Sequence, residues 1–214
     1  MNDSYYHVFN RGVEKRLTFM NRRELSRALE LLYFYQFSLT PVRFSYFKDL
    51  SVDKQRNIIE VMIASGKIAD VIAYCLMPNH FHLLLKQRKE NGIPTFISNF
   101  TNAYTKYFNT KNDRVGPLFQ GIFKAVFVET DEQLIHLTRY IHINPFVSSI
   151  VELTNLRNYP WSSYRAYISE EKDSMLNGEE VEKMRKLIPN YESFVMDHAS
   201  YAREISFINH LIIE

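Results

Sequence analysis

Two histidines, His80 and His82, stand one residue apart in the apolar stretch CLMPNHFHLLL, residues 75–85. A β-strand alternates its side chains between faces, so both imidazoles would share one face while Phe81 lies on the other. By the rise of a strand they would be about 7 Å apart, which lets them hold one metal ion and leaves positions for water or substrate. A polar pair within a core would show the same spacing.

The second candidate group lies in the stretch TDEQLIHLTRYIHINP, residues 130–145. At 100° per residue, His136, Tyr140 and Asn144 fall on one face of a helix, and His142 points nearly the opposite way. A tyrosine oxygen can act as a covalent nucleophile, a histidine one turn away could help to deprotonate it, and an asparagine carbonyl can help to ligate a metal. A half-buried tyrosine with solvated neighbours explains the same pattern.

Basic residues interleaved with aromatic ones form the third, weaker signal. Such residues can contact phosphates and stack on unpaired bases, and the candidates for these contacts are Arg11, Lys106 and Lys124. A solvated surface accounts for most basic residues equally well. By contrast Tyr104 and Tyr107 fall on the broad apolar face of a helix expected over residues 93–109, so we expect them in the core.

The composition is that of an ordinary globular protein, with 46% hydrophobic and 23% charged residues. A net charge of +2 permits a local nucleic-acid-binding patch without indicating one. The single cysteine, Cys75, excludes an internal disulfide framework and suits a reducing compartment. No apolar run is long enough to span a membrane, so we expect a cytoplasmic protein that does not bind membranes.

The elements that must position these residues follow from hydrophobic periodicity and turn signals. The order is β-α-α-β-β-α-β-α with a helical tail, which predicts an α+β fold with a mostly antiparallel sheet. Three segments have weaker patterns. FSYFKDL, residues 44–50, is expected to be irregular, the dipeptide Asn144-Pro145 to end its helix, and YPWSSYRAY, residues 159–167, to be a connector. Residues 179–214 are expected to form one or two helices.

Four segments in this order resemble the one-tyrosine transposases of the HUH superfamily, most closely the REP-associated tyrosine transposases. The segments are YHVFNRG, MPNHFHLLL, GPLFQGIFKAVFVE and RYIHINP. The resemblance covers roughly residues 5–168. With it, the expected fold is α+β, an antiparallel sheet of the ferredoxin or RRM type with helices packed on it, plus a helical C-terminal tail. The expected division is a transposase (nuclease) domain over residues 1–170 and a helical extension over residues 171–214.

The resemblance also implies roles. His80 and His82 would hold a divalent metal, Mg²⁺ or Mn²⁺, and Tyr140 would be the nucleophile. Asn144 stands where some relatives carry a third polar ligand. The implied function is a metal-dependent transposase that cleaves and rejoins single-stranded or hairpin DNA through a 5′-phosphotyrosine intermediate. It would act in the bacterial cytosol, associated with the nucleoid when active.

Other functions remain open at this point. A related nicking endonuclease of replication or conjugation would share the active site and differ in its target. A non-catalytic, RRM-like nucleic-acid-binding module would use aromatic residues to stack bases, but would leave the histidine pair and the tyrosine helix unexplained. Whether the protein is a monomer or a homodimer is undecided.

Overall fold

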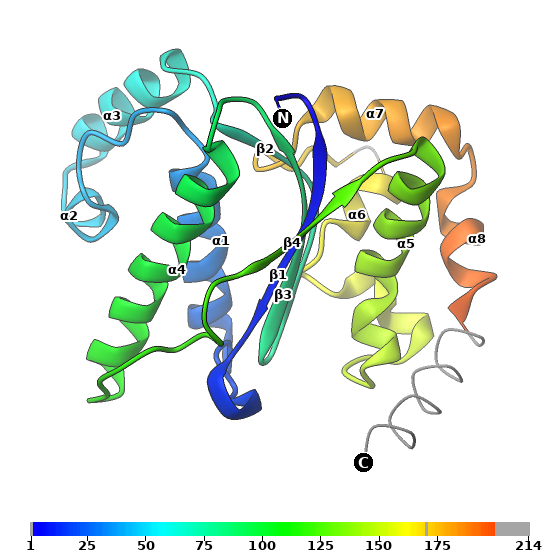
Figure 1. Cartoon of the computed structure of the whole chain (residues 1–214), viewed down its shortest axis with the longest axis horizontal. Helices are drawn as coiled ribbons and strands as arrows, with labels where there is room; N and C mark the ends of the chain where they lie inside the picture. The colour runs from blue at the N-terminus through cyan, green and yellow to red at the C-terminus, as the bar shows by residue number, and fades with distance from the viewer. Residues whose placement is uncertain (1, 170, 200–214) are drawn as a thin grey trace.

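A computed structural model describes residues 2–169 and 171–199. Four antiparallel strands form a central sheet in the order β2-β3-β1-β4 (Figure 1). Their bounds are Tyr5–Arg11 for β1, Ala69–Met77 for β2, His80–Gln87 for β3 and Lys124–Val128 for β4. This sheet, with helices on both faces, confirms the expected α+β fold. In residues 119–129, regular pairing with β1 is limited to Lys124–Val128. Phe119 forms an isolated bridge with Gly12, and the N–H of Gln120 donates to the carbonyl of Arg11.

The central strands explain why the histidines lie where they do. Every residue of β2 is buried, and β2 turns into β3 at Pro78 and Asn79 without a break in the pairing. The carbonyl of Pro78 accepts hydrogen bonds from the backbone N–H groups of Thr18 and Phe19, which fixes this turn. Residues 69–87 therefore form a tight hairpin, and His80 is the first residue after its turn.

One face of the sheet is covered by the helices that lie between β1 and β2 and between β3 and β4 (Figure 1). They are α1 (Arg22–Tyr35), α2 (Phe44–Lys48), α3 (Val52–Ala64) and α4 (Gly92–Lys111). The expectation that residues 44–50 are irregular is wrong. Phe44 and Phe47, one helical turn apart, are both buried against Phe34 of α1, with ring centroids 5.1 and 5.2 Å from it, and this packing stabilises a short helix.

The opposite face carries the helices that follow β4 (Figure 1). They are α5 (Asp131–Val147), η2 (Leu153–Asn158), α6 (Tyr164–Ile168), α7 (Gly178–Leu187) and α8 (Tyr191–Met196), while the short helix η1 (Val13–Lys15) follows β1. Thr130 caps α5, because its hydroxyl accepts a hydrogen bond from the N–H of Gln133.

The expected end of α5 at Asn144-Pro145 is also wrong, because the helix continues to Val147. Proline removes one intrahelical hydrogen bond, but only in the last turn. The carbonyls of Asn144 and Pro145 still accept bonds from the N–H groups of Ser148 and Ile150, and Phe146 is buried. The last turn therefore forms, and Asn144 stays inside a regular helix.

The stretch 159–167 is not a connector but packs along the edge strand β2. The N–H of Leu76 donates to the carbonyl of Trp161, and Ser163 is bonded to the backbone of Tyr74 in both directions. The hydroxyls of Tyr159 and Tyr167 donate to two carbonyls of the same strand. These bonds cover an edge that would otherwise offer unpaired backbone groups.

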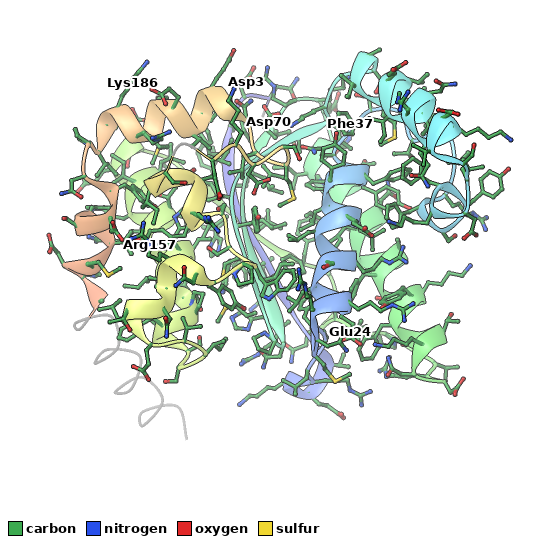
Figure 2. The ribbon with its side chains drawn as sticks, turned by 180° about the vertical axis from the view of Figure 1, so that it is seen from behind. Asp3, Glu24, Phe37, Asp70, Arg157 and Lys186 are labelled. Carbon is green, nitrogen blue, oxygen red and sulfur yellow. The ribbon has the colours of Figure 1, made fainter. Side chains whose placement is uncertain are left out.

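The helices after residue 170 contact both the sheet and α5. The ammonium of Lys86 on β3 lies 2.6 Å from Glu180 of α7. The buried Asp70 of β2, labelled in Figure 2, accepts a hydrogen bond from the side chain of Asn177. The expected division at residue 170 stays a prediction, and residues 200–214 of the expected tail lie outside the described residues. Within the part of the chain that the structure describes, no helix is long and apolar enough to cross a membrane.

Candidate active site

The two histidines lie on a central strand and face α5. The register of β1 on β3 pairs Phe9 with His82 and Arg11 with His80, so these four side chains share one face of the sheet. The rings of His80 and His82 are 5.0 Å apart between centroids and perpendicular to each other. Strand alternation thus places both imidazoles on one face, as expected from the sequence.

Tyr140 lies over the same face, on α5. Its ring centroid is 5.4 Å from that of His82 and 6.0 Å from that of His7, in the same chain. Tyr140 is nevertheless 47% exposed, because it lines an open pocket of about 670 Å³ between the sheet and α5. The structure therefore brings together the tyrosine and the histidine pair that the sequence singled out.

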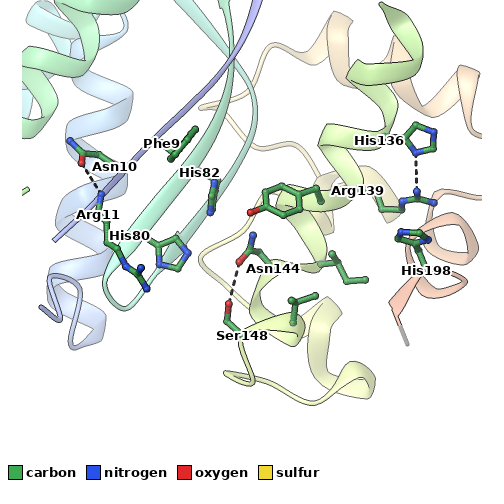
Figure 3. A pocket seen from close by; sticks show the side chains of 13 residues that line it. Phe9, Asn10, Arg11, His80, His82, His136, Arg139, Asn144, Ser148 and His198 are labelled. Carbon is green, nitrogen blue, oxygen red and sulfur yellow. Dashed lines mark hydrogen bonds between the residues drawn. The ribbon is translucent and has the colours of Figure 1, made fainter. Parts of the chain in front are cut away.

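The pocket combines basic and amide side chains with apolar ones. Figure 3 shows Arg11, His80 and His82 extending from the sheet toward Asn144 on α5, with Arg139 and His136 at the far side. No aspartate or glutamate is among the described residues that line it. The full lining is Phe9, Asn10, Arg11, His80, His82, His136, Arg139, Tyr140, Ile143, Asn144, Val147, Ser148 and His198. A pocket with two arginines and no carboxylate suits a phosphate group.

Burial keeps the imidazoles neutral. The pKa of His80 is lowered to about 4, chiefly by burial and also by the nearby Arg11 guanidinium, while a hydrogen bond with Asn144 opposes both effects. Burial also holds the pKa of His82 well below its usual value, and the neighbouring His80 and His7 add to this. Neutral imidazoles at neutral pH have a lone pair for a metal ion.

Neighbouring side chains determine which nitrogen faces the pocket. Nδ1 of His80 lies 2.6 Å from the amide oxygen of Asn79, which accepts its N–H and leaves Nε2 with the lone pair. Nδ1 of His82 lies 3.0 Å from Nε2 of His7. Bonds of this kind orient metal-binding histidines in other proteins.

His7 was missed by the sequence reasoning. The available signal was its position in YHVFNRG, where it shares a strand face with Phe9 and Arg11. What the sequence does not contain is the register that places this face beside His82. That register comes from the pairing of β1 with β3, two strands far apart in the chain.

The other histidines of α5 have different surroundings. His136 lines the pocket, and its Nδ1 lies 2.8 Å from the guanidinium of Arg139, which donates to it. His142 is buried on the far side of the helix, where its two nitrogens lie 2.7 Å from the Tyr191 hydroxyl and 2.8 Å from the Ser163 hydroxyl. The expectation that His142 points away from Tyr140 is confirmed.

Of the three candidate phosphate contacts, two lie at the pocket and one does not. Arg11 lines the pocket, and the Lys124 ammonium lies 5.9 Å above the ring of Phe9, which also lines it. Lys106 lies on α4, on the opposite face of the sheet, so the structure does not bring it to Tyr140. Tyr104 is fully buried and Tyr107 packs against the same core, as expected of both.

The donor set for a metal is small. Across residues 2–169 and 171–199, no cluster of three or more His, Cys, Asp or Glu is placed to hold a metal ion. What the pocket offers is two neutral imidazoles and the amide of Asn144, which is hydrogen bonded to His80. Three protein donors beside an open cavity fit a metal whose remaining positions go to substrate and water.

The family is shown by sequence. The profile described as "Transposase IS200 like" matches residues 32–144, more than half of the chain. The chain belongs to the IS200-like transposase family. The match spans both histidines of the pair, Tyr140 and Asn144. Membership in this transposase family implies transposase activity, and the family is typically metal-dependent.

One solved structure supports the fold of this IS200-like transposase. It is that of a REP-associated tyrosine transposase bound to a REP hairpin, with 13% sequence identity and a TM-score of 0.50. The likeness covers 83% of this chain and 93% of the other. At that identity it shows a shared fold. None of the curated proteins matches the chain.

Proposed function

We propose that this IS200-like transposase cleaves and rejoins single-stranded DNA by transesterification, with Tyr140 as the nucleophile. The observation that carries the proposal is the contact of Tyr140 with His82, 5.4 Å between ring centroids, inside a pocket that also contains His80, Asn144 and two arginines. This is the one described pocket in which an accessible tyrosine lies beside paired imidazoles.

The proposed transesterification needs neither water nor ATP. The phenol oxygen of Tyr140 forms a bond to phosphorus, the bond from phosphorus to the 3′ oxygen breaks, and that oxygen takes up a proton. The products are a 5′-phosphotyrosine and a free 3′-hydroxyl. Because a phenol leaves phosphorus more easily than an alkoxide does, a 3′-hydroxyl can reverse the step and join a new strand. His136, one turn from Tyr140, is the proposed acceptor of the phenol proton once its Nδ1 is released from the Arg139 guanidinium that donates to it.

His80, His82 and Asn144 are the proposed metal-holding residues, for Mg²⁺ or Mn²⁺. A bound divalent ion would withdraw charge from the phosphate oxygens and orient the scissile bond. Two imidazole ligands suit Mn²⁺ better than Mg²⁺, which prefers oxygen ligands. Arg11 beside His80 would contact the same phosphate or its neighbour.

The proposed substrate is a single-stranded segment, either alone or next to a hairpin. The nucleophile lies on a helix above the sheet, so the strand must enter the pocket between them and turn its phosphate toward Tyr140. An unpaired strand has the freedom to do this. The related structure holds a hairpin, which supports hairpin DNA as the form to test.

The competing functions predict different outcomes. A nicking endonuclease of replication or conjugation would use the same residues and differ only in the sequence it cleaves. A non-catalytic binding module would bind DNA and form no covalent bond. The grouping of Tyr140 with the histidine pair supports the catalytic proposal over this module.

The direct test is covalent trapping. End-labelled hairpin DNA with a single-stranded flank is incubated with the protein and Mg²⁺ or Mn²⁺, then separated by denaturing electrophoresis. A labelled band at the mass of the protein plus DNA, absent after addition of a chelator, is the expected result. Binding of the same DNA without any adduct across a set of flanking sequences would favour the non-catalytic module.

A further inference from the structure

A second groove lies on the layer opposite the Tyr140 pocket, between α1, α2 and α4. Its volume is about 810 Å³, and its base is formed by apolar and aromatic side chains that include Tyr35, Phe44 and Tyr107. Five basic residues line it: Arg23, Arg27, Arg43, Lys106 and Lys111. Among the described residues that line this groove there is no carboxylate.

Most of this positive charge is not balanced inside the protein. Lys111 is paired at 2.6 Å with the buried Glu24, at the end of α1 seen in Figure 2. In the described part of the chain, the other four basic residues form no ion pair with a carboxylate. The whole chain has a net charge of only +2, so four unopposed cations around one groove are a local concentration that favours an anionic ligand.

Arg27 is held in place before any ligand binds. Its guanidinium carbon lies 5.0 Å from the ring centroid of Phe44 and 5.0 Å from that of Tyr107. A guanidinium stacked on two rings loses little freedom on binding, and its planar N–H groups match a phosphate. Arg23, one turn earlier on α1, is exposed and extends the basic surface.

We propose that this groove binds the phosphate backbone of DNA, as a contact separate from the Tyr140 pocket. The cations come from different elements along the groove, which suits a chain of phosphates better than one small anion. The exposed amides of Asn99 and Asn102 line the same groove and can bond to sugar or phosphate oxygens. The candidate contact Lys106 thus binds DNA on this layer.

The test removes charge only from exposed residues, so that folding is preserved. The triple variant Arg23→Gln, Arg43→Gln, Lys106→Gln is compared with the control Lys54→Gln, Arg56→Gln, Lys186→Gln, which removes the same charge from exposed residues outside the groove. Binding of a fluorescent hairpin with a single-stranded flank is measured by anisotropy over a salt series. A further variant, Arg27→Lys, keeps the charge but loses the planar guanidinium.

The groove variant should bind the hairpin about tenfold or more weakly at low salt. Its slope of log affinity against log salt should fall by roughly 0.9 for each duplex phosphate that the variant no longer neutralises. The control variant should keep most of the slope of log affinity against log salt that the unaltered protein shows. Equal weakening in both triple variants, or an unchanged slope in the groove variant, would overturn the proposal. Binding of tripolyphosphate, a small anion, is measured for the same variants. If the groove variant lost tripolyphosphate binding and kept its DNA binding, the groove would be a small-anion site and the proposal would be overturned.

The outcome is separable from that of the proposed function. At saturating DNA the groove variant should still form the adduct at the unaltered rate, because Tyr140 and the histidines are untouched. If the unaltered protein forms no adduct, the proposed function fails while the salt slopes still decide whether the groove binds DNA.

Discussion

The ring of Tyr140 meets that of His82 almost perpendicularly, with planes 83° apart and centroids 5.4 Å apart. One residue comes from a helix and the other from a central strand, so the contact joins the two layers that enclose the pocket. The ring of Tyr140 is positioned by packing, and the residue stays 47% exposed at the pocket.

Tyr140→Phe should abolish the covalent adduct and leave the free energy of unfolding almost unchanged. The variant removes the only atom proposed to bond to phosphorus and keeps the ring that packs on His82. The matched control is Tyr107→Phe, whose hydroxyl is buried without a hydrogen-bond partner in the described structure. Denaturing electrophoresis and urea unfolding measure the two effects. An adduct that persists without the Tyr140 oxygen would assign the nucleophile elsewhere.

Tyr104→Phe provides a second comparison, in which stability should fall and the adduct should still form. The Tyr104 hydroxyl donates to the carbonyl of Thr18 at 2.6 Å in the core. Its removal leaves a buried carbonyl without this donor and should cost about 1–2 kcal/mol of stability. The adduct should form as before when tested well below the unfolding midpoint. Loss of the adduct with the fold intact would contradict the structural role assigned to Tyr104.

Two inactive variants should not rescue each other when mixed. His80→Ala lacks a proposed metal ligand and Tyr140→Phe lacks the nucleophile, and each should be inactive alone. Since both residues lie in one pocket of one chain, a mixture should form no adduct beyond the sum of the two. Restored adduct formation would show that the working site combines residues from two chains. Size-exclusion chromatography of the same mixture reports whether any such pair exists.

His7→Ala should weaken metal binding although His7 is not a proposed ligand. The N–H at Nδ1 of His82 donates to Nε2 of His7 and so orients the His82 ring, and loss of such a partner typically costs 10–100-fold in metal affinity. His7→Gln supplies an amide oxygen that can accept the same N–H, so it should recover part of that loss. Electron paramagnetic resonance titration with Mn²⁺ measures both without relying on activity. Equal affinity in all three proteins would remove His7 from the site.

Stability should fall in mild acid, partly through His142. Burial lowers the pKa of His142 from 6.5 to about 3, so protons bind to the unfolded chain first as the pH drops below 6.5. The loss starts there and is complete below the folded pKa. At pH 4.5 His142 alone should account for about 2–3 kcal/mol. In urea unfolding at pH 7 and pH 4.5, His142→Gln should lose less stability between the two pH values than the unaltered protein. Equal losses would show that His142 is protonated in the native state.

Local patterns predicted which candidate residues share a face, because strand alternation and helical periodicity are local properties. The shared face of His80 and His82 and the shared face of Tyr140 and Asn144 follow directly from them. What could not be predicted depends on contacts between distant segments. The place of His7 depends on strand register, and that of Lys106 on which face its helix covers.

The errors in element assignment have the same origin. Pro145 stays helical because the residues after it supply bonds to the last turn and Phe146 is buried. Residues 159–167 look irregular by periodicity, yet their hydroxyl and backbone groups are matched to one particular strand, β2. Neither the bonds that complete the last turn of α5 nor the pairing of residues 159–167 with β2 can be read from the local sequence.

α5 has contacts on two sides, one facing the sheet and one facing the helical segments that follow it. Tyr140 faces the sheet. On the opposite side of the helix, His142 is hydrogen bonded to Ser163 and Tyr191, which belong to segments that come later in the chain. Those segments therefore set the distance of α5 from the sheet, and with it the width of the pocket in which Tyr140 lies. If the pocket admits a DNA strand as we propose, a change of side-chain volume behind the helix should alter the pocket width and so the choice of strand, with every residue that lines the pocket left unchanged.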